Sequence, residues 1–401
     1  MKKFKKIKNG TVTSPDGFMA DGIFAGLKSA GEDKLDLGIL ISEEPCEWAA
    51  TYTDNKIKSS SIDYCKEVKS KIKGIIVNSG SANCCVGEQG LIDARNITKK
   101  CEEIFQSKSP FLMSSTGVIG VEIPVGLIIN SIEKFNLDNN GGEKFSRAII
   151  TTDSKTKNIS IEVKSKKGSY KIGGVAKGSG MIHPKMGTML SYITTDAGIS
   201  STNLTSILRN SVKNSFNQID IDGDTSTNDT VVIMSNGLSG AIINTKEDIN
   251  EFQEALDYVT KYLARLIAED GEGISHLITV EVTGAKDEKD ALEVSNTVVS
   301  SSLVKTAIFG KDPNWGRIMM AIGNANAEII RDKVKIYVNG IQIAEDGKSI
   351  SFHYQSVLSA LDKFQIDIEI DLGIGNGKGI AWGSDLTEEY VIFNSAYTTY
   401  I

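Results

Sequence analysis

Apolar residues recur along the chain at two different periods, which predicts strands and helices in alternation from end to end. Apolar runs at Leu37–Ile41 and Ile75–Val77 are typical of buried strands. Apolar residues at helical spacing predict two helices, one over residues 94–104 and one over residues 204–216.

The clearest helical signal follows Thr245. Asp248 stands three residues after it, as in a capping box, where each residue bonds the backbone N–H of the other. An apolar stripe then runs from Phe252 to Ile267. We therefore expect a long helix that starts at Thr245 and packs one face on the core.

Strands are predicted near the C-terminus. The alternating residues Val334–Val338 lead into Asn339–Gly340, a tight hairpin signal. Isoleucines then alternate with acidic residues over Ile366–Ile370, which predicts a strand with one buried face and one solvent-exposed face. Because the sequence shows neither repeats nor a linker-like break, we expect an α/β (α+β) fold with mixed sheets packed with helices.

Composition is that of an ordinary globular protein: 401 residues, 40% hydrophobic and 24% charged. A net charge of -7 argues against nucleic acid or an anionic membrane as a partner. The basic segment Met1–Lys8 is followed by Asn9–Gly10, where a signal peptide would have its apolar stretch. The least charged segment, Ser109–Val121, is too short to span a bilayer. We expect a cytoplasmic protein.

Neither a metal nor another cofactor is indicated. The five cysteines all lie in the first quarter, without a CxxC pair and far from the three histidines, which gives little support to a zinc site. The adjacent Cys84 and Cys85 could form a redox-active pair, but we interpret them as small buried apolar residues. The acidic run Asp222–Asp229 does not keep the spacing of a calcium-binding loop. We interpret this run as a hydrogen-bonded polar turn near an active site.

The glycine-rich segment Lys177–Leu190 contains a Gly187–Thr188 pair that suggests self-cleavage. Cutting there would make Thr188 an N-terminal residue, with an α-amine of pKa about 7.7–8.0 beside its hydroxyl. Gly187 has no Cβ and can hold the strained backbone that such a cut needs. On local residues alone, a glycine-rich turn before a strand is the alternative.

Three further segments could complete a site for acyl transfer. Ser114–Gly120 offers a hydroxyl beside a glycine N–H, the pair of donors that an oxyanion needs, or it is a polar loop. Lys177 could bind a carboxylate or be solvated. Glu272, in Asp270–Gly273, could bind an ammonium group or lie in water at a helix exit.

Together these segments resemble the ornithine acetyltransferase (glutamate N-acetyltransferase) family of arginine biosynthesis, from about Gly17 to Thr399. The matching segments, in chain order, are Asn78–Gly80, Ala82–Asn83, Ser115–Gly120, Thr151–Asp153, Ala176–Ile182, Asp222–Asp229, Asp270–Gly273, Phe309–Gly310, Asp312–Arg317 and Ala381–Gly383.

The resemblance implies self-cleavage before Thr188 into an alpha chain, 1–187, and a beta chain, 188–401. Thr188 would take acetyl from N2-acetylornithine and pass it to glutamate by a ping-pong route, with acetyl-CoA as a further possible donor. Thr116 and Gly117 would form the oxyanion hole. The residues implied to hold the substrates are Thr151, Thr152, Lys177, Thr188, Glu272, Asn394 and Thr399. The implied fold is α/β, with the two chains interlocked and paired into a heterotetramer of two alpha and two beta chains.

Several positions depart from the family pattern. Gly187 stands where alanine is frequent, His183 and Lys185 are more charged than usual, and Ser275–His276 replaces Thr-Lys. Ser81 stands where asparagine is usual, and Tyr400–Ile401 extend beyond Thr399. These departures leave open a related N-acyl transferase or an amidohydrolase acting on other acyl-amino acids. An uncleaved metabolite-binding protein is a third hypothesis.

Overall fold

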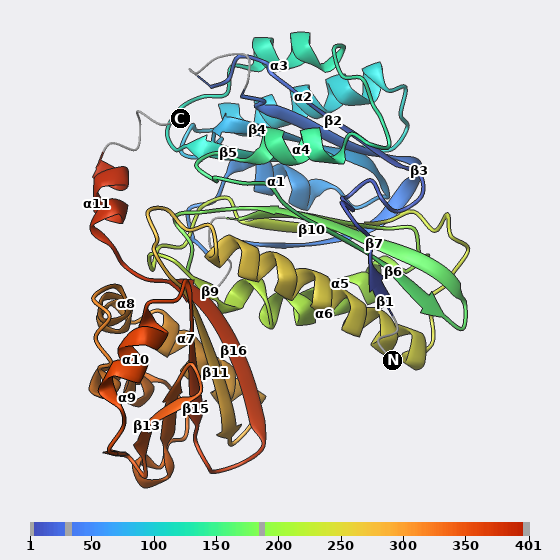
Figure 1. The fold of residues 1–401 in the computed structure, drawn as a ribbon. Coiled ribbons are helices and arrows are strands. Elements are labelled where there is room, and N and C mark those ends of the chain that lie inside the picture. The colour runs from blue at the N-terminus through green and yellow to red at the C-terminus, as the bar shows by residue number, and fades with distance from the viewer. Residues whose placement is uncertain (1–3, 29–33, 184–188, 396–401) are drawn as a thin grey trace.

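Two mixed β-sheets packed with helices make up the part of the chain that the structure describes, residues 4–28, 34–183 and 189–395 (Figure 1). The structure is a computed structural model. One sheet has nine strands and the other seven within these residues. The predicted fold class, mixed sheets packed with helices, is confirmed.

The nine-stranded sheet combines strands from both sides of residues 187 and 188. Its strands, in spatial order, are β1 (Phe4–Lys6), β6 (Lys157–Ser165), β7 (Gly168–Lys177), β8 (Leu190–Thr195), β10 (Thr230–Ser235), β3 (Leu37–Tyr52), β4 (Ile72–Ser81) and β5 (Phe111–Val118), with β2 (Phe18–Ile23) beside β3. The pairs β8–β10 and β4–β5 are parallel, and the other pairs are antiparallel. Strands β8 and β10, from the second half of the sequence, therefore lie between β7 and β3, from the first half.

The long strand β3 divides this sheet into two parts. Its first residues pair with β2 and β4, its last residues pair with β10, and the register shifts between Ile41 and Cys46. Four helices cover the part around β2 to β5: α1 (Ser60–Glu67), α2 (Gln89–Ile104), α3 (Val125–Ile132) and α4 (Gly142–Ile149). Two helices pack against the other part: α5 (Ser201–Lys213) and α6 (Lys246–Ala268).

Strands β8 and β10 are buried at every residue. Ile193 and Ile233 belong to the core beneath α5 and α6, whereas Tyr192 and Val232 pack with β3, β4 and Phe145 in a second core. Since both faces are covered, the burial of each large apolar side chain on these strands contributes about 1.5–3 kcal/mol to the stability of the fold.

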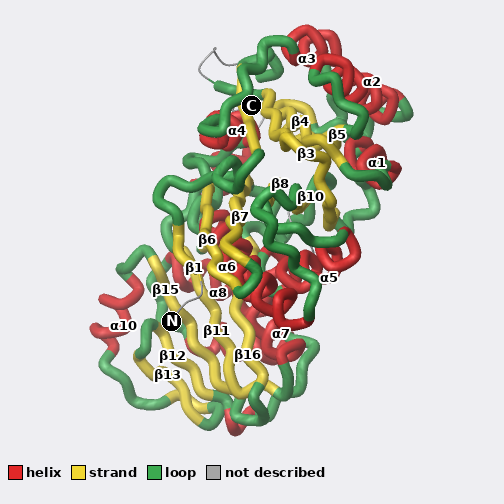
Figure 2. The backbone as a smooth tube through the Cα atoms, turned by 90° about the vertical axis from the view of Figure 1, so that its right-hand side faces the viewer, coloured by secondary structure: helices red, strands yellow, loops and turns green. Residues whose placement is uncertain are grey.

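The seven-stranded sheet forms the lower part of the molecule in Figure 1. Its strands, in order, are β14 (Lys348–Ser349), β13 (Ile341–Glu345), β12 (Lys335–Val338), β15 (Gln365–Asp371), β11 (Leu277–Ala285), β16 (Gly377–Ser384) and β9 (Ile219–Asp220). The accompanying helices are α7 (Glu288–Val299), α8 (Ser302–Phe309), α9 (Trp315–Asn324) and α10 (Tyr354–Leu361). These helices lie on one face of the sheet, and the face turned to the viewer in Figure 2 has no helix over it. Short 3₁₀ turns at Phe216–Gln218 and Arg331–Lys333 and a last helix, α11 (Glu388–Ser395), complete the elements.

The periodic patterns predicted these elements well. The predicted buried strands lie within β3 and β4, and the Thr245–Asp248 capping box is present at the start of α6. Asn339 and Gly340 both have positive φ (46° and 77°), as the predicted hairpin requires. In β15 the isoleucines are buried and the residues between them are partly exposed, which confirms the predicted alternation.

Two predictions were wrong. Helix α5 ends at Lys213, and the buried Phe216 lies on a 3₁₀ turn because the Ser215 hydroxyl donates to the Ser211 carbonyl oxygen (2.5 Å) as the chain leaves the helix. Cys84 is buried, as predicted, but Cys85 is exposed, on a left-handed turn (φ 59°) before α2. Among the described helices, none has the length and apolarity needed to cross a membrane.

Candidate active site

A cavity of about 100 Å³ lies where the ends of β5 and β7 meet the loops after α4 and α6. Residues from both halves of the sequence line it. They are Thr116, Gly117, Ile119, Thr151, Thr152, Lys177, Gly180, Met181, Ser226, Thr227, Asn228, Glu272 and Asn394. Seven residues that the sequence assigned to the oxyanion hole or to substrate binding are thus brought together: Thr116, Gly117, Thr151, Thr152, Lys177, Glu272 and Asn394.

The end of β5 supplies Thr116 and Gly117 to the cavity wall. Gly117 has a φ of 130°, a conformation that other residues rarely adopt. A Cβ there would lie 2.3 Å from the carbonyl carbon of Gly80 on the neighbouring strand. Glycine is therefore needed for the close approach of β4 and β5 at this point.

Lys177, the last residue of β7, is buried with its ammonium at the cavity. Its Nζ donates to Oγ1 of Thr151 (3.0 Å) and of Thr116 (3.3 Å), and lies 4.0 Å from Asp153 Oδ2. Burial lowers the pKa of Lys177, and the Asp153 carboxylate offsets part of that effect. A ligand carboxylate bound in the cavity could approach the Lys177 ammonium more closely than Asp153 does.

A second buried lysine is fully paired. Lys157 Nζ lies 2.6 Å from Asp153 Oδ1 and 2.6 Å from Asp270 Oδ2, and the backbone N–H of Gly178 donates to Asp153 (2.7 Å). Burial alone would raise the pKa of Asp153, but the Lys157 and Lys177 ammonium groups hold it below its usual range. This cluster ties the loop after α4 to β6 and to the end of α6, and so positions the carboxylate beside Lys177.

Glu272 points into the site rather than into water, which decides between the two interpretations of its turn. It is 6% exposed, and its carboxylate accepts from Thr152 Oγ1 (2.6 Å) and Asn394 Nδ2 (3.1 Å). A Cβ at Gly180 would lie 2.3 Å from Glu272 Oε2, so the glycine-rich segment leaves room for this carboxylate. The cavity therefore has a cation on one side and an anion on the other.

The loop Asp220–Thr230, which we call the acidic loop, holds the chain on both sides of residues 184–188. Before that segment, Asp222 accepts from the backbone N–H groups of Met181 (2.5 Å) and Ile182 (2.9 Å). After it, Asp229 Oδ1 accepts from Met189 N–H (3.0 Å).

Asn228 fixes the acidic loop to the cavity wall. Its Nδ2 donates to the carbonyl oxygens of Ala82 (2.6 Å) and Ser115 (2.7 Å). The predicted hydrogen-bonded turn near the site is confirmed, and the described residues contain no cluster of side chains that could hold a metal ion.

Some sequence predictions lie outside the described residues. Gly187, Thr188 and Thr399 belong to this group, as do Lys185 and the Tyr400–Ile401 extension. Sequence reasoning also missed residues: Lys157, which pairs across 113 positions with Asp270, and Asp229, which it noted only as part of an acidic run.

The unusual pair Ser275–His276 does not make a catalytic triad with Asp385. Both the Ser275 hydroxyl (2.9 Å) and Asp385 Oδ2 (2.8 Å) contact the same ring nitrogen, His276 Nδ1. A triad histidine uses one nitrogen for the carboxylate and the other for the nucleophile. These residues instead fix the turn between α6 and β11.

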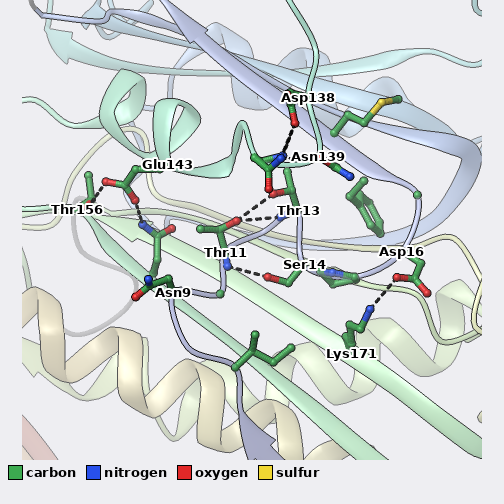
Figure 3. Close-up of a pocket in the computed structure, with 18 of the residues that line it drawn as sticks. Asn9, Thr11, Thr13, Ser14, Asp16, Asp138, Asn139, Glu143, Thr156 and Lys171 are labelled. Carbon is green, nitrogen blue, oxygen red and sulfur yellow. Dashed lines mark hydrogen bonds and ion pairs between the residues drawn. The ribbon is translucent and has the colours of Figure 1, made fainter.

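A larger hollow, of about 1340 Å³, lies near the N-terminal strand (Figure 3). Three of its charged side chains have partners within the wall: Lys171 pairs with Asp16 (2.7 Å), and Glu143 accepts from Thr156 (2.9 Å) and Asn158 (3.0 Å). None of the described residues that the sequence assigned to catalysis or substrate binding is among those that line it.

Comparisons with known proteins match nearly the whole chain. The profile of the ArgJ family matches residues 19–399. The arginine biosynthesis bifunctional protein ArgJ of Streptococcus thermophilus is 42% identical over 400 residues, covering 98% of this chain and 100% of the relative. The protein of the same name from Caldanaerobacter subterraneus is 40% identical over 405 residues, with 98% and 100% covered.

Solved structures match in part. The Bacillus halodurans argJ protein shares 42% identity over 51% of this chain and 97% of that chain, with a TM-score of 0.49. Ornithine acetyltransferase from Mycobacterium tuberculosis, complexed with ornithine, shares 27% identity over 45% of this chain and 98% of that chain, with a TM-score of 0.42. From the family profile and the full-length relatives, the chain belongs to the ArgJ family.

Proposed function

We propose that this protein is a self-cleaving acetyltransferase that moves acetyl from N2-acetylornithine to glutamate in arginine biosynthesis. The observation that carries the proposal is the convergence of Thr116, Gly117, Lys177 and Glu272 on one cavity, beside the chain on both sides of the Gly187–Thr188 junction. Full-length relatives are named arginine biosynthesis bifunctional protein, which agrees with this activity.

The charges of the cavity suit an acylated amino acid. Lys177, short of a close carboxylate, would bind the α-carboxylate of N2-acetylornithine or of glutamate. Glu272 would bind the side-chain ammonium of ornithine, with Thr152 and Asn394 holding its carboxylate in place. N2-acetylornithine carries these two charged groups, an α-carboxylate and a side-chain ammonium.

Transfer would proceed through an ester on Thr188. The free α-amine of Thr188 takes the proton of its hydroxyl, and Oγ1 attacks the acetyl carbonyl carbon. The Thr116 hydroxyl and the Gly117 N–H stabilise the oxyanion. Its collapse breaks the C–N bond as the Thr188 ammonium passes its proton to the leaving nitrogen, and ornithine is released. The glutamate amine then attacks the ester, and N-acetylglutamate leaves as Thr188 regains its proton.

Self-cleavage would leave an alpha chain, 1–187, and a beta chain, 188–401. Strands β8 and β10 of the second chain lie between β7 and β3 of the first, so the chains would stay interlocked. We propose a heterotetramer of two alpha and two beta chains, which size measurement on the purified protein checks.

Intact mass spectrometry with and without N2-acetylornithine tests the proposal. We expect two chains cut at Gly187–Thr188, and about 42 daltons added to the second chain, the mass of one acetyl group in place of a proton. Thr188→Ala should stay uncut and transfer no acetyl, with the fold unchanged. A full-length, uncut and fully active wild-type chain would contradict the proposal.

The same assay separates the alternatives. Acetate release without glutamate, at the rate of transfer, would instead assign a hydrolase. Replacing N2-acetylornithine by acetyl-CoA tests the second donor: an acetylated Thr188 chain and N-acetylglutamate formation would make the enzyme bifunctional.

A further inference from the structure

Cys84 and Cys85 are adjacent thiols to which the proposed acetyl transfer assigns no role. Their Sγ atoms lie 3.8 Å apart. Cys84 is buried, whereas Cys85 is exposed on a left-handed turn (φ 59°). Among the five cysteines, Cys85 is the one exposed to solvent. A dissolved thiol reagent would therefore reach Cys85 first and find a second thiol beside it.

The backbone around these thiols holds the segment that follows β5. The Ala82 N–H donates to the Val118 carbonyl oxygen (2.9 Å). The Gly120 N–H donates to the Cys84 carbonyl oxygen (2.9 Å). Ala82 also accepts from Nδ2 of Asn228, a residue that lines the cavity (2.6 Å). The chain at the two cysteines is therefore tied to the end of the strand that carries the predicted oxyanion donors.

A disulfide between the two thiols would form by exchange with a small-molecule disulfide such as oxidised glutathione. The Cys85 sulfur attacks one sulfur of the reagent, its proton passes to the departing thiolate, and a mixed disulfide remains. The Cys84 sulfur then attacks the Cys85 sulfur, its proton passes to the second glutathione thiolate, and this thiol departs. The two cysteines lose two electrons and two protons, which reduce the reagent to two thiols.

Proximity favours the second step, and strain makes its product reversible. Burial raises the pKa of Cys84, which slows its attack, but the neighbouring sulfur at 3.8 Å offsets this because the reaction is intramolecular. Adjacent Cα atoms lie about 3.80 Å apart, closer than the range of about 4.4–6.8 Å in ordinary disulfides. The bond would therefore be strained and readily reduced.

Closing the bond would also change the backbone. The sulfurs must approach by about 1.8 Å to reach the disulfide length of about 2.05 Å, and the ring so formed contains the peptide between Cys84 and Cys85. The carbonyl group of that peptide accepts from the Gly120 N–H, so its rotation would disturb this hydrogen bond. Gly117 lies just before the segment held in this way, so its N–H would be displaced. A misplacement of about 1 Å at a reacting centre can cost about 100-fold in rate.

We propose that Cys84 and Cys85 form a thiol-modification site for small-molecule disulfides, and that closing the bond between them reversibly slows acetyl transfer. The effect on transfer rests on the proposed function, whereas the formation of the disulfide does not.

Oxidised glutathione, applied to the purified protein, is the probe. After treatment the protein is unfolded, its free thiols are alkylated, and the peptide that carries both cysteines is measured by mass spectrometry. We expect the wild-type peptide to lose about 2 daltons, the mass of two hydrogen atoms, and to take no alkyl group. Acetyl transfer should fall at least about tenfold and return when dithiothreitol is added.

Cys84→Ala and Cys85→Ser separate the two steps. Cys84→Ala cannot close the bond, so its peptide should gain about 305 daltons, the mass of one bound glutathione. Cys85→Ser should take no glutathione and keep its transfer rate within about twofold under the same treatment, since Cys84 is buried. Before treatment, both variants should transfer acetyl at the wild-type rate.

The mass and the rate decide different parts of the proposal. A wild-type peptide that keeps both thiols, or that holds glutathione without closing the bond, overturns the site. A closed disulfide with an unchanged transfer rate overturns the coupling, as does an equal loss of rate in Cys85→Ser, which would assign the loss to another thiol. A wild-type protein that transfers no acetyl before treatment removes the proposed function and the coupling with it, while the mass still decides the disulfide.

Discussion

The two sheets of this protein differ in where they bury charged residues. In the nine-stranded sheet, Lys157 and Lys177 on β6 and β7 are buried, with Asp153 between them. In the seven-stranded sheet, Glu281 of β11 is exposed and Glu369 of β15 is half-buried. The nine-stranded sheet buries this charged cluster beside the cavity, whereas the seven-stranded sheet buries an ion pair at its edge strand β9, between Asp220 and Lys305 of α8.

The difference indicates where the chemistry lies. Removing a charge from water costs several kcal/mol, and a sheet that needs only to be stable keeps its charges outside. The seven-stranded sheet reaches the site only at its edge, where Lys305 of α8 pairs with Asp220 (2.9 Å) at the start of the acidic loop. We therefore expect substitutions in the seven-stranded sheet to affect stability more than acetyl transfer.

The largest expected effect on stability is at Lys157. Lys157→Met leaves Asp153 and Asp270 buried without their cation, which should cost about 3–5 kcal/mol of unfolding free energy. Lys335→Met, which breaks a half-exposed pair with Glu345 (3.6 Å) in the other sheet, should cost less than about 1 kcal/mol. Urea unfolding of both variants measures the contrast; equal losses would contradict it.

The next effect is a pH dependence at Asp222. Burial raises the pKa of Asp222 to about 6, above its ordinary 3.8, so the folded chain binds this proton more tightly than the unfolded chain. Its contribution is therefore present at low pH and lost as pH rises from about 4 to 6, by up to about 3 kcal/mol. Unfolding curves between pH 4 and 7 should differ between the wild type and Asp222→Asn by this contribution. Equal pH dependence in the two proteins would contradict the assignment to Asp222.

A smaller effect, on binding alone, is expected at Glu272. Glu272→Gln keeps the shape but removes the charge facing the proposed ornithine ammonium, a loss of about 1.5–3 kcal/mol, or about 10–100-fold in KM. The KM for glutamate as acceptor should change much less, because glutamate lacks the side-chain ammonium that ornithine carries. Steady-state kinetics with each substrate varied in turn tells the two apart, and an equal rise in both would argue against the assignment.

The smallest effect is expected on the open face of the seven-stranded sheet. Glu281 on β11 is exposed, and Glu281→Gln should change the unfolding free energy by less than about 0.5 kcal/mol and leave transfer unchanged. A measurable loss of activity would mean that this face does more than support the fold.

Sequence patterns predicted those elements that depend on residues close together in the chain. The capping box of α6 and the alternation of β15 depend on residues three and two positions apart, and both were predicted. The motifs also named seven residues that meet in the cavity.

The pairing of Lys157 with Asp270 could not be predicted in the same way. It joins residues 113 positions apart, and it exists only because β6 and the end of α6 pack together. The partnership of Asp229 with Met189 likewise depends on the parallel pairing of β8 with β10, in which Thr230 lies opposite Leu190. Such pairs follow from topology, which spacing along the sequence does not contain.

The insertion of β8 and β10 between β7 and β3 has a consequence for the life of the molecule. An uncut chain folds as one body, in a reaction that does not depend on concentration. After a cut at Gly187–Thr188, the two chains could separate only if β8 and β10 lost their pairing with β7 and β3. After denaturation, refolding would require the two chains to associate, so it would depend on their concentration. Self-cleavage would thus be irreversible in its effect on folding, because the covalent link between the two halves would be lost. The cleaved protein would then depend on slow unfolding, that is, on kinetic stability.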